Sequence, residues 1–351
     1  MHHQAETELT LKTTGDIHRF MRLYVAPAAL NAAMELRLFW RLDDEPAAAE
    51  RIAQDLSIPL HRCRRWLELL ADLGLLEQQA GKYAPSPVAR TAIIEAYSPE
   101  VWVLIAGDSR DRYPIGHDLT RHITHPESVW TAQGLTPPDY LQQMIDDPER
   151  ARRFARILYE IHAPFAERLA EMLDMSGVRK LMDLGGGSGV WPLALLQKNP
   201  DLNALVIDFE NVCRAGREIA AETAVADRIR YQAVDFMRDD LPAGFDMILH
   251  CDVGIYTEEL FGKVHAALNP QGRLVIVDWI RRPGWRPTLL HRIHTFSSSL
   301  QGQYTIPDTA EIRQMLENCG FEWITERLLE PTTCHEISGI PGPVVIEARK
   351  Y

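Results

Sequence analysis

Short apolar runs and helical apolar patterns alternate along the second half of the chain. From residue 178 onward, runs of strand-forming residues are separated by stretches with apolar residues at helical spacing. This alternation predicts a doubly wound α/β domain with a mainly parallel sheet. The expected strands are Lys180–Leu184, Ala204–Asp208, Ile229–Ala233, Phe245–Cys251 and Arg273–Asp278, and Phe321–Leu329 and Val344–Ala348 are expected to close the sheet.

The N-terminal part of the chain has a different pattern. Residues 16–40 carry a long apolar stripe at helical spacing, and we expect part of it to serve an oligomer interface. Residues 47–90 have the order helix, turn, helix and short hairpin, which predicts a winged helix. The basic residues that open its second helix either contact nucleic acid or form a solvated face of a dimerisation module; they are His61, Arg62, Arg64 and Arg65.

We divide the chain into three expected parts. Residues 1–96 form the N-terminal helical and winged-helix domain, and residues 178–351 form the α/β domain. Residues 97–177 are expected to form a helical connector that lines the active site, ending in a helix over about 148–173.

Charge and cysteine usage narrow the function. A surplus of 49 acidic over 37 basic residues gives a formal charge of −12, which argues against nucleic acid and anionic membranes and favours a small-molecule partner. Five scattered cysteines without a C-x-x-C pair predict neither a disulfide framework nor a zinc site. No apolar stretch is long enough for a membrane span and the N-terminus has no apolar signal region, so we expect a cytoplasmic protein.

A glycine-rich turn follows the first strand of the α/β domain. Gly185, Gly187 and Gly189 give the spacing G-x-G-x-G. The dinucleotide fingerprint G-x-G-x-x-G requires a glycine at position 190, where Val190 stands. The spacing therefore favours S-adenosylmethionine over NAD as the cofactor.

Acidic residues at the ends of successive strands support the same cofactor. Asp183 precedes the glycine turn and is expected to brace it. Asp208 can accept both ribose hydroxyls, and Asp235 can accept the adenine amino group while Phe236 packs on the ring. We also count His250, near the end of the fourth strand, among the cofactor-binding candidates.

These motifs closely resemble the class I S-adenosylmethionine-dependent O-methyltransferases of the caffeate and hydroxyneurosporene type. The resemblance spans nearly the whole chain, and the matching segments are residues 33–90, Arg152-Arg-Phe154, Asp183–Gly189, Val206-Ile-Asp208, Asp235-Phe236 and Asn269-Pro-Gln-Gly272. It implies a Rossmann-like methyltransferase domain behind an α-helical winged-helix dimerisation domain. It also implies a homodimer whose N-terminal segment lends residues to the partner's pocket.

The chain departs from this family at the catalytic motif after the fourth strand. The family reads L-K-R-x-L-H-D-W, and alignment without gaps places Cys251 at the Lys, Asp252 at the Arg, Ile255 at the catalytic His and Tyr256 at the Asp. The usual base is therefore missing.

Three interpretations of the acceptor side follow from that departure. His294 replaces the base, with Tyr256 orienting the acceptor and His291 on the same helical face. Alternatively, His250 or Asp252 joins His291 and His294 in holding a divalent metal for C-methylation of an α-keto acid. In the third interpretation the two histidines form only a polar helix face, and our site assignment includes no metal. His162, on the expected active-site helix, either contacts cofactor or substrate or is a satisfied buried histidine.

The leading functional hypothesis is O-methylation of a small natural product or pigment-like acceptor, in which proximity to the methyl group supplies much of the rate. The alternatives are a C-methyltransferase, a relative that keeps the cofactor without methylating, and a winged-helix regulator that binds DNA.

Overall fold

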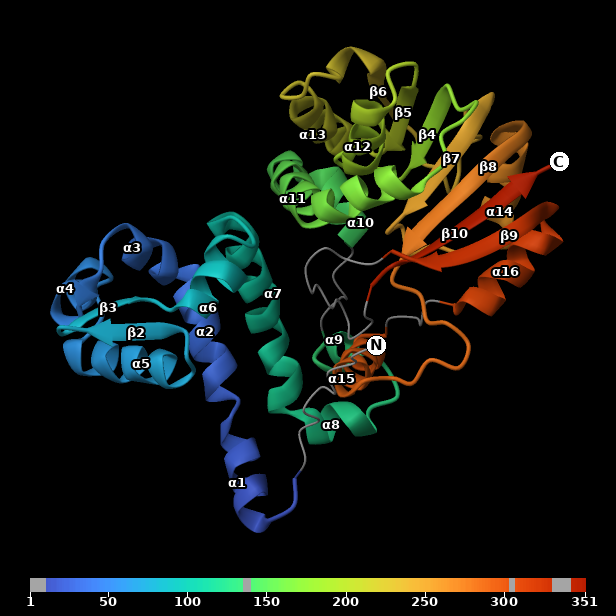
Figure 1. Cartoon of the computed structure of the whole chain (residues 1–351). Helices are drawn as coiled ribbons and strands as arrows, with labels where there is room; N and C mark the ends of the chain where they lie inside the picture. Colours follow the sequence, from blue (N-terminus) through green and yellow to red (C-terminus); the bar gives the residue numbers. More distant parts are fainter. Residues whose placement is uncertain (1–10, 135–139, 303–306, 330–341) are drawn as a thin grey trace. The chain divides into compact units, whose positions relative to one another are not determined.

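The chain forms two compact units, residues 1–121 and 122–351, in the computed structural model. The structure describes residues 11–134, 140–302, 307–329 and 342–351, so Cys334 and the first ten residues lie outside the described part. Figure 1 traces the elements of both units in chain order.

The first unit is built mainly from helices around a small sheet. Its elements are α1 Thr14–Arg22, α2 Val25–Glu35, α3 Leu38–Asp44, β1 Ala47–Ala48, α4 Ala49–Asp55, α5 Leu60–Asp72, β2 Leu76–Gln79, β3 Lys82–Pro85, α6 Pro87–Ala89, a π-helical turn Arg90–Ile94 and α7 Pro99–His117, after which α8 Leu119–Thr124 crosses into the second unit. The sheet has the order β1-β3-β2. The helix expected from Ala47 begins two residues later because Ala47 and Ala48 pair with β3, but the winged-helix order is the one expected.

The second unit is a seven-stranded sheet with helices on both faces (Figure 1). Its helices are α9 Val129–Ala132, α10 Tyr140–Asp146, α11 Pro148–Met172, α12 Val190–Lys198, α13 Glu210–Ala220, a 3₁₀ turn Ala226–Arg228, α14 Glu258–Ala267, α15 Leu289–Leu300 and α16 Thr309–Asn318. Its strands are β4 Lys180–Leu184, β5 Asn203–Asp208, β6 Ile229–Ala233, β7 Phe245–Cys251, β8 Leu268–Asp278, β9 Phe321–Leu328 and β10 Val344–Lys350. All seven expected strands are present, and the α/β class is confirmed.

The strand order is β6-β5-β4-β7-β8-β10-β9, with β10 antiparallel to both of its neighbours. Alternate strand residues face two separate cores, because side chains along a strand point to opposite faces. One core packs the sheet against α11, α12 and α13, and the other packs it against α14 and α16. The order reverses between β4 and β7, which opens a crevice at the carboxyl ends of these strands.

The structure divides the expected connector, residues 97–177, between the two units. Helix α7 belongs to the first unit, whereas α9, α10 and α11 belong to the second. Helix α11 lies on α12 and α13, and ion pairs join Arg152 to Glu218 and Arg156 to Glu222. Helix α11 is therefore the part of the connector that makes the most contacts with the α/β unit.

Candidate functional site

A cavity of about 390 Å³ lies at the carboxyl ends of the central strands, entirely within the second unit. Polar lining residues come mainly from the segments that follow β4, β5, β6 and β7, and the apolar ones come half from α10 and α11 and half from those segments and α13. The lining consists of Gln142, Met144, Ile145, Ala151, Phe154, Ala155, Leu158, Gly185, Gly187, Ser188, Asp208, Phe209, Val212, Asp235, Phe236, Met237, Arg238, Asp252, Val253 and Ile255. This cavity brings most of the expected cofactor residues together.

The glycine turn between β4 and α12 needs left-handed backbone. Gly185, Gly187 and Gly189 have φ of 63°, 55° and 76°, a region that other residues rarely adopt. A Cβ atom on Gly189 would lie 2.3 Å from the hydroxyl oxygen of Tyr231, which donates a hydrogen bond to the Ser188 carbonyl at 3.1 Å. The turn is therefore compact, with its backbone open to the cavity at Gly185 and Gly187.

Asp208 connects the end of β5 to this turn. Its carboxylate accepts hydrogen bonds from the Gly187 amide at 3.0 Å and the Phe209 amide at 2.7 Å. Burial raises the pKa of Asp208 to about 6, against the lowering effect of these two amides. The group is thus held in place at the cavity wall, where it can accept further hydrogen bonds from a ligand hydroxyl.

Asp235 and Phe236 lie in the loop after β6. Asp235 accepts from the Met237 amide at 3.2 Å, and its second oxygen is 3.7 Å from Nε of Arg238. The Phe236 ring lies 3.4 Å from the position of a Cβ atom on Gly185. This contact brings the aromatic ring beside the glycine turn.

Asp183 lies behind the turn rather than in the cavity lining. It is fully buried, and neither carboxyl oxygen has a hydrogen-bond partner among the described residues. A Cβ atom on Gly186 would lie 2.2 Å from Oδ2 of Asp183, so the carboxyl fills the space beneath the turn. Burial, with a smaller contribution from the charge of Asp208, raises the pKa of Asp183 well above its usual range.

His250 is fully buried in β7 and is absent from the cavity lining given above. Its Nε2 lies 2.9 Å from the Ile255 carbonyl oxygen, which ties the strand to the loop that follows it. Burial lowers the pKa of His250 to about 4, so the ring is neutral at neutral pH. This geometry gives His250 a structural contact, and its role toward the cofactor remains a prediction.

The residues expected on the acceptor side do not meet in this cavity. The Tyr256 hydroxyl is buried and donates to Oδ2 of Asp278, and burial, followed by the charge of Asp278, raises the pKa of Tyr256 well above its usual range. His291 is buried with its ring 4.7 Å from that of Trp285, and His294 lies half-buried on the same helix, α15. The lining includes none of Tyr256, His291 and His294, whose catalytic roles stay predictions.

The described part of the chain also lacks a cluster of metal-ligating side chains that would support the metal interpretation. No group of three or more His, Cys, Asp or Glu side chains there is arranged to hold a metal ion. In the same residues, no helix is both long and apolar enough to cross a membrane.

The structure adds a pair that sequence reasoning did not assemble. Nε2 of His162, on α11, lies 3.3 Å from Oδ2 of Asp252, which follows β7 and lines the cavity. The sequence singled out each residue separately, but nothing in a linear pattern indicates that they face each other.

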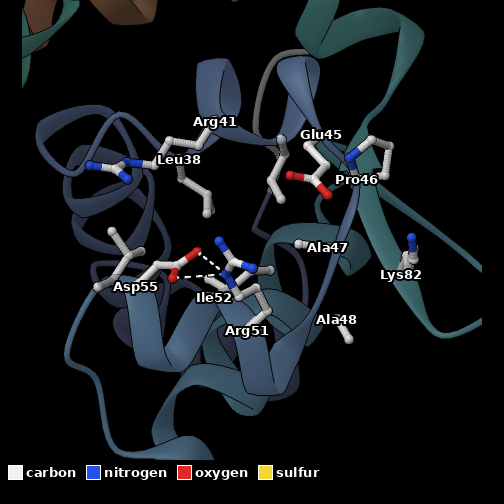
Figure 2. Close-up of a pocket in the computed structure, with 12 residues that line it drawn as sticks. Leu38, Arg41, Glu45, Pro46, Ala47, Ala48, Arg51, Ile52, Asp55 and Lys82 are labelled. Atoms are coloured by element: carbon white, nitrogen blue, oxygen red, sulfur yellow. Dashed lines mark hydrogen bonds and ion pairs between the residues drawn. The ribbon is translucent and has the colours of Figure 1, made fainter.

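A second hollow, of about 310 Å³, lies in the first unit around α3 and α4 (Figure 2). Arg51 and Asp55, one turn apart on α4, form an ion pair among its lining residues, with Nε of Arg51 2.7 Å from Oδ2 of Asp55. Its lining contains no histidine, cysteine, serine or aromatic residue. We therefore place no chemistry there.

The basic residues of α5 are partly neutralised. Arg64 pairs with Glu50, and Arg65 pairs with Glu68 at 2.8 Å. Such pairing is typical of a solvated helix face.

Comparison with known proteins identifies both units. A family model described as an O-methyltransferase domain matches residues 118–322, and one described as an O-methyltransferase dimerisation domain matches residues 18–94. The N,N-dimethyltransferase OxyT of Streptomyces rimosus is 27% identical over 304 residues, which cover 85% of this chain and 88% of that protein. The 3-hydroxy-5-methyl-1-naphthoate 3-O-methyltransferase of Streptomyces sahachiroi is 32% identical over 221 residues, 63% of this chain and 62% of the relative.

Solved structures agree on the fold. PigF with SAH has a TM-score of 0.78 at 20% identity, covering 97% of this chain and 100% of that one. Human N-acetylserotonin methyltransferase in complex with SAM has a TM-score of 0.75 at 18% identity, covering 97% and 99%. The expectation of a methyltransferase that uses S-adenosylmethionine agrees with both complexes and with the family model. Because that model spans more than half of the sequence, the chain belongs to the O-methyltransferase family.

Proposed function

We propose that this enzyme transfers a methyl group from S-adenosylmethionine to a hydroxyl oxygen of an aromatic natural product. The observation that carries the proposal is a single cavity that combines the glycine turn, Asp208 and Asp235 with an apolar wall from α10 and α11. The wall suits a planar apolar acceptor, because small-molecule sites are mostly apolar with a few polar groups that fix orientation.

The residues present fit the cofactor. Left-handed glycines give it close backbone approach, with Gly185 and Gly187 lining the cavity and Gly189 ending the turn, while Asp183 braces the turn from behind. Asp208 lines the cavity, and in this proposal it accepts hydrogen bonds from the ribose hydroxyls. Asp235 accepts a hydrogen bond from the adenine amino group, and Phe236 packs on the adenine ring. When bound, S-adenosylmethionine supplies a methyl group on a positively charged sulfur.

Catalysis then depends on position. The chain must hold the acceptor atom in line with the methyl–sulfur bond, and good alignment supplies about 7–11 kcal/mol of barrier lowering in favourable cases. Tyr256, His291 and His294 remain candidates for the acceptor side, and Trp285 holds the ring of His291.

The acceptor atom is tested with deuterated-methyl S-adenosylmethionine. We expect the enzyme to convert a hydroxynaphthoate to its methyl ether with stoichiometric release of S-adenosylhomocysteine, measured by mass spectrometry and by NMR of the product. L-tyrosine and an aromatic primary amine are tested as acceptors in parallel. They are chosen because relatives include an L-tyrosine C(3)-methyltransferase and an N,N-dimethyltransferase. Label on nitrogen or carbon alone would overturn O-transfer, and cofactor binding without turnover of any acceptor would favour a non-methylating relative.

We further propose a homodimer formed through the N-terminal unit, whose N-terminal segment reaches the partner's pocket. Helices α1 and α2 and the turn between them expose large apolar side chains that their own unit leaves uncovered, namely Ile17, Phe20, Met21, Tyr24 and Val25. Such a patch marks an interaction surface, and the dimerisation family model, which begins at residue 18, covers all of it except Ile17. A cytoplasmic location is our expectation for this dimer, since Cys63, Cys213, Cys251 and Cys319 are free thiols.

The double substitution Met21→Lys and Tyr24→Lys is expected to dissociate the dimer, because two charges would be buried without partners. Light scattering after gel filtration should then give the monomer mass, 39.9 kDa, in place of twice that value. The control is Trp323→Lys, at a residue of β9 that is equally exposed in the other unit. An unchanged mass for the double variant would exclude this surface from the interface.

A further inference from the structure

The pair formed by His162 and Asp252 has the geometry of a proton acceptor facing the cavity. His162 is buried, whereas the side chain of Asp252 retains 38% of its exposure, on the cavity wall. The 3.3 Å separation between Nε2 and Oδ2 puts the ring nitrogen next to the carboxylate, as in an ion pair when the ring is protonated. One member of the pair is therefore accessible to a ligand, and the other supports it from inside the fold.

The backbone directs Asp252 toward the glycine turn. Asp252 follows β7 directly with φ of 54°, a left-handed conformation that aspartate tolerates better than most residues. Its amide donates to the Val277 carbonyl at 2.8 Å, which fixes it against β8. Its neighbour Val253 lies 3.4 Å from the position of a Cβ atom on Gly185. Asp252 thus lies beside the part of the cavity where the cofactor's methionine end is expected.

Two indole rings fix the orientation of the histidine. The ring centroids of Trp191 and Trp279 lie 5.8 Å and 5.9 Å from that of His162. Phe165 packs edge-on against Trp279 at 5.5 Å, so the second indole is itself held. The imidazole therefore has little freedom to turn away from Asp252.

The other carboxylates of the cavity lining are engaged elsewhere. Asp208 accepts from two backbone amides, and Asp235 is bonded to the Met237 amide near Arg238. Both also lie where the ribose and adenine are expected. Asp252 is the acidic lining residue in the described chain that the cofactor assignment leaves unused.

We propose that Asp252 takes the proton from the acceptor hydroxyl and that His162 is a positioning residue that holds and polarises this carboxylate. The inference rests on the proposed methyl transfer and deepens it. The acceptor O–H bond breaks and its proton passes to a carboxylate oxygen of Asp252, while the oxygen electron pair forms the new O–CH₃ bond. The methyl–sulfur bond breaks at the same time, and its electron pair stays on sulfur.

Other ionisable groups lie close enough to Asp252 to interact with it electrostatically. They are Asp278 at the end of β8, Tyr256 and Cys251, besides His162 on α11. Burial, together with the charge of Asp252, raises the pKa of Asp278 to about 6. Asp278 is bonded to Tyr256 and the Trp279 amide and is itself buried, so it is not the group that meets the acceptor.

The test compares Asp252→Asn, His162→Gln and His162→Phe with the wild type in the full-length enzyme. For a hydroxynaphthoate acceptor we expect Asp252→Asn to lower kcat about 100-fold, the usual range for loss of a general base. S-adenosylhomocysteine affinity, measured by calorimetry, should stay within about twofold, because hydrogen bonds to the cofactor are retained. His162→Gln keeps an N–H donor and should lose less kcat than His162→Phe.

Two readouts separate proton transfer from a structural role. The activity of Asp252→Asn should recover as the pH approaches the pKa of the acceptor phenol, and a more acidic nitro-substituted acceptor should lose less rate. The ¹⁵N shift of Nε2 in His162 should change in Asp252→Asn without any acceptor present. Asp201→Asn, at an exposed turn, is the matched control with unchanged kinetics.

Each outcome decides between the hypotheses. If the wild type turns over and Asp252→Asn has a near-normal kcat, the inference is overturned while the proposed function stays intact. His294→Ala is assayed as well, and if it is the inactive variant the same conclusion follows. Loss of S-adenosylhomocysteine binding in Asp252→Asn would make this carboxylate a cofactor contact instead. Failure of the wild type to release S-adenosylhomocysteine over the acceptor panel would overturn the proposed function itself.

Discussion

Asp208→Asn is expected to weaken binding of S-adenosylmethionine and S-adenosylhomocysteine about 100-fold or more. The proposed contacts are two hydrogen bonds from ribose hydroxyls to a charged carboxylate, each of which contributes about 1.5–3 kcal/mol. The amide keeps the size of the side chain but lacks the charge and one acceptor. Calorimetric titration with S-adenosylhomocysteine measures the effect without any acceptor.

The same substitution is expected to leave the protein folded at neutral pH. Burial raises the pKa of Asp208 from 3.8 to about 6, so the folded state binds a proton more tightly than the unfolded state. Stability therefore falls as the pH rises from about 4 to about 6, and above this window the ionised group costs about 3 kcal/mol. Asparagine removes that cost while losing one hydrogen bond to a backbone amide. The Tm at pH 7.5 should consequently change little.

The pKa of Asp208 also predicts the pH dependence of cofactor binding in the wild type. Protonation removes the charge that binds the ribose, so affinity should weaken as the pH falls below about 6. Asp208→Asn should not show this loss of affinity at low pH, and Asp201→Asn should behave as the wild type. Equal affinity in wild type and Asp208→Asn would contradict the assignment of Asp208.

Gly189→Ala is expected to lower the free energy of unfolding by about 3 kcal/mol, as the sum of left-handed strain and overpacking. Its φ is 76°, and the new methyl carbon would lie 2.3 Å from the Tyr231 hydroxyl. Because the hydroxyl bonds to Ser188 within the turn, relief of the clash also displaces the turn. Cofactor binding should therefore fall together with stability.

Gly177→Ala separates the two causes of that destabilisation. Gly177 has φ of 79°, but a Cβ atom there meets nothing within 4 Å. Strain alone should cost about 1 kcal/mol, with cofactor affinity unchanged. Denaturant unfolding followed by calorimetry measures both quantities, and equal losses in the two variants would exclude the steric contribution of Tyr231.

Local chemistry explains why the strands and the cofactor turn could be predicted. The strands Lys180–Leu184 and Ile229–Ala233 have the expected bounds, because a glycine turn follows the first and the second alternates apolar and polar residues before Asp235. The left-handed turn at Gly185–Gly189 requires glycine whatever surrounds it. Strand β8 differs because it begins at Leu268, which pairs with Phe245, and the register then shifts before Arg273 pairs with Met247. That pairing depends on the neighbouring strand.

The α/β class and the methyl-donor motif could thus be predicted from the sequence, because both depend on residue type and spacing along the chain. The absence of the family's usual histidine stays a prediction of the same kind. Which polar groups lie in contact depends on the tertiary packing. In the folded chain, His250 is buried against the loop that follows its strand. Tyr256 donates a hydrogen bond to Asp278, and His162 lies beside Asp252. The physical reason is that helix packing and the left-handed backbone at Asp252 set side-chain directions, and neither leaves a periodic pattern in the sequence.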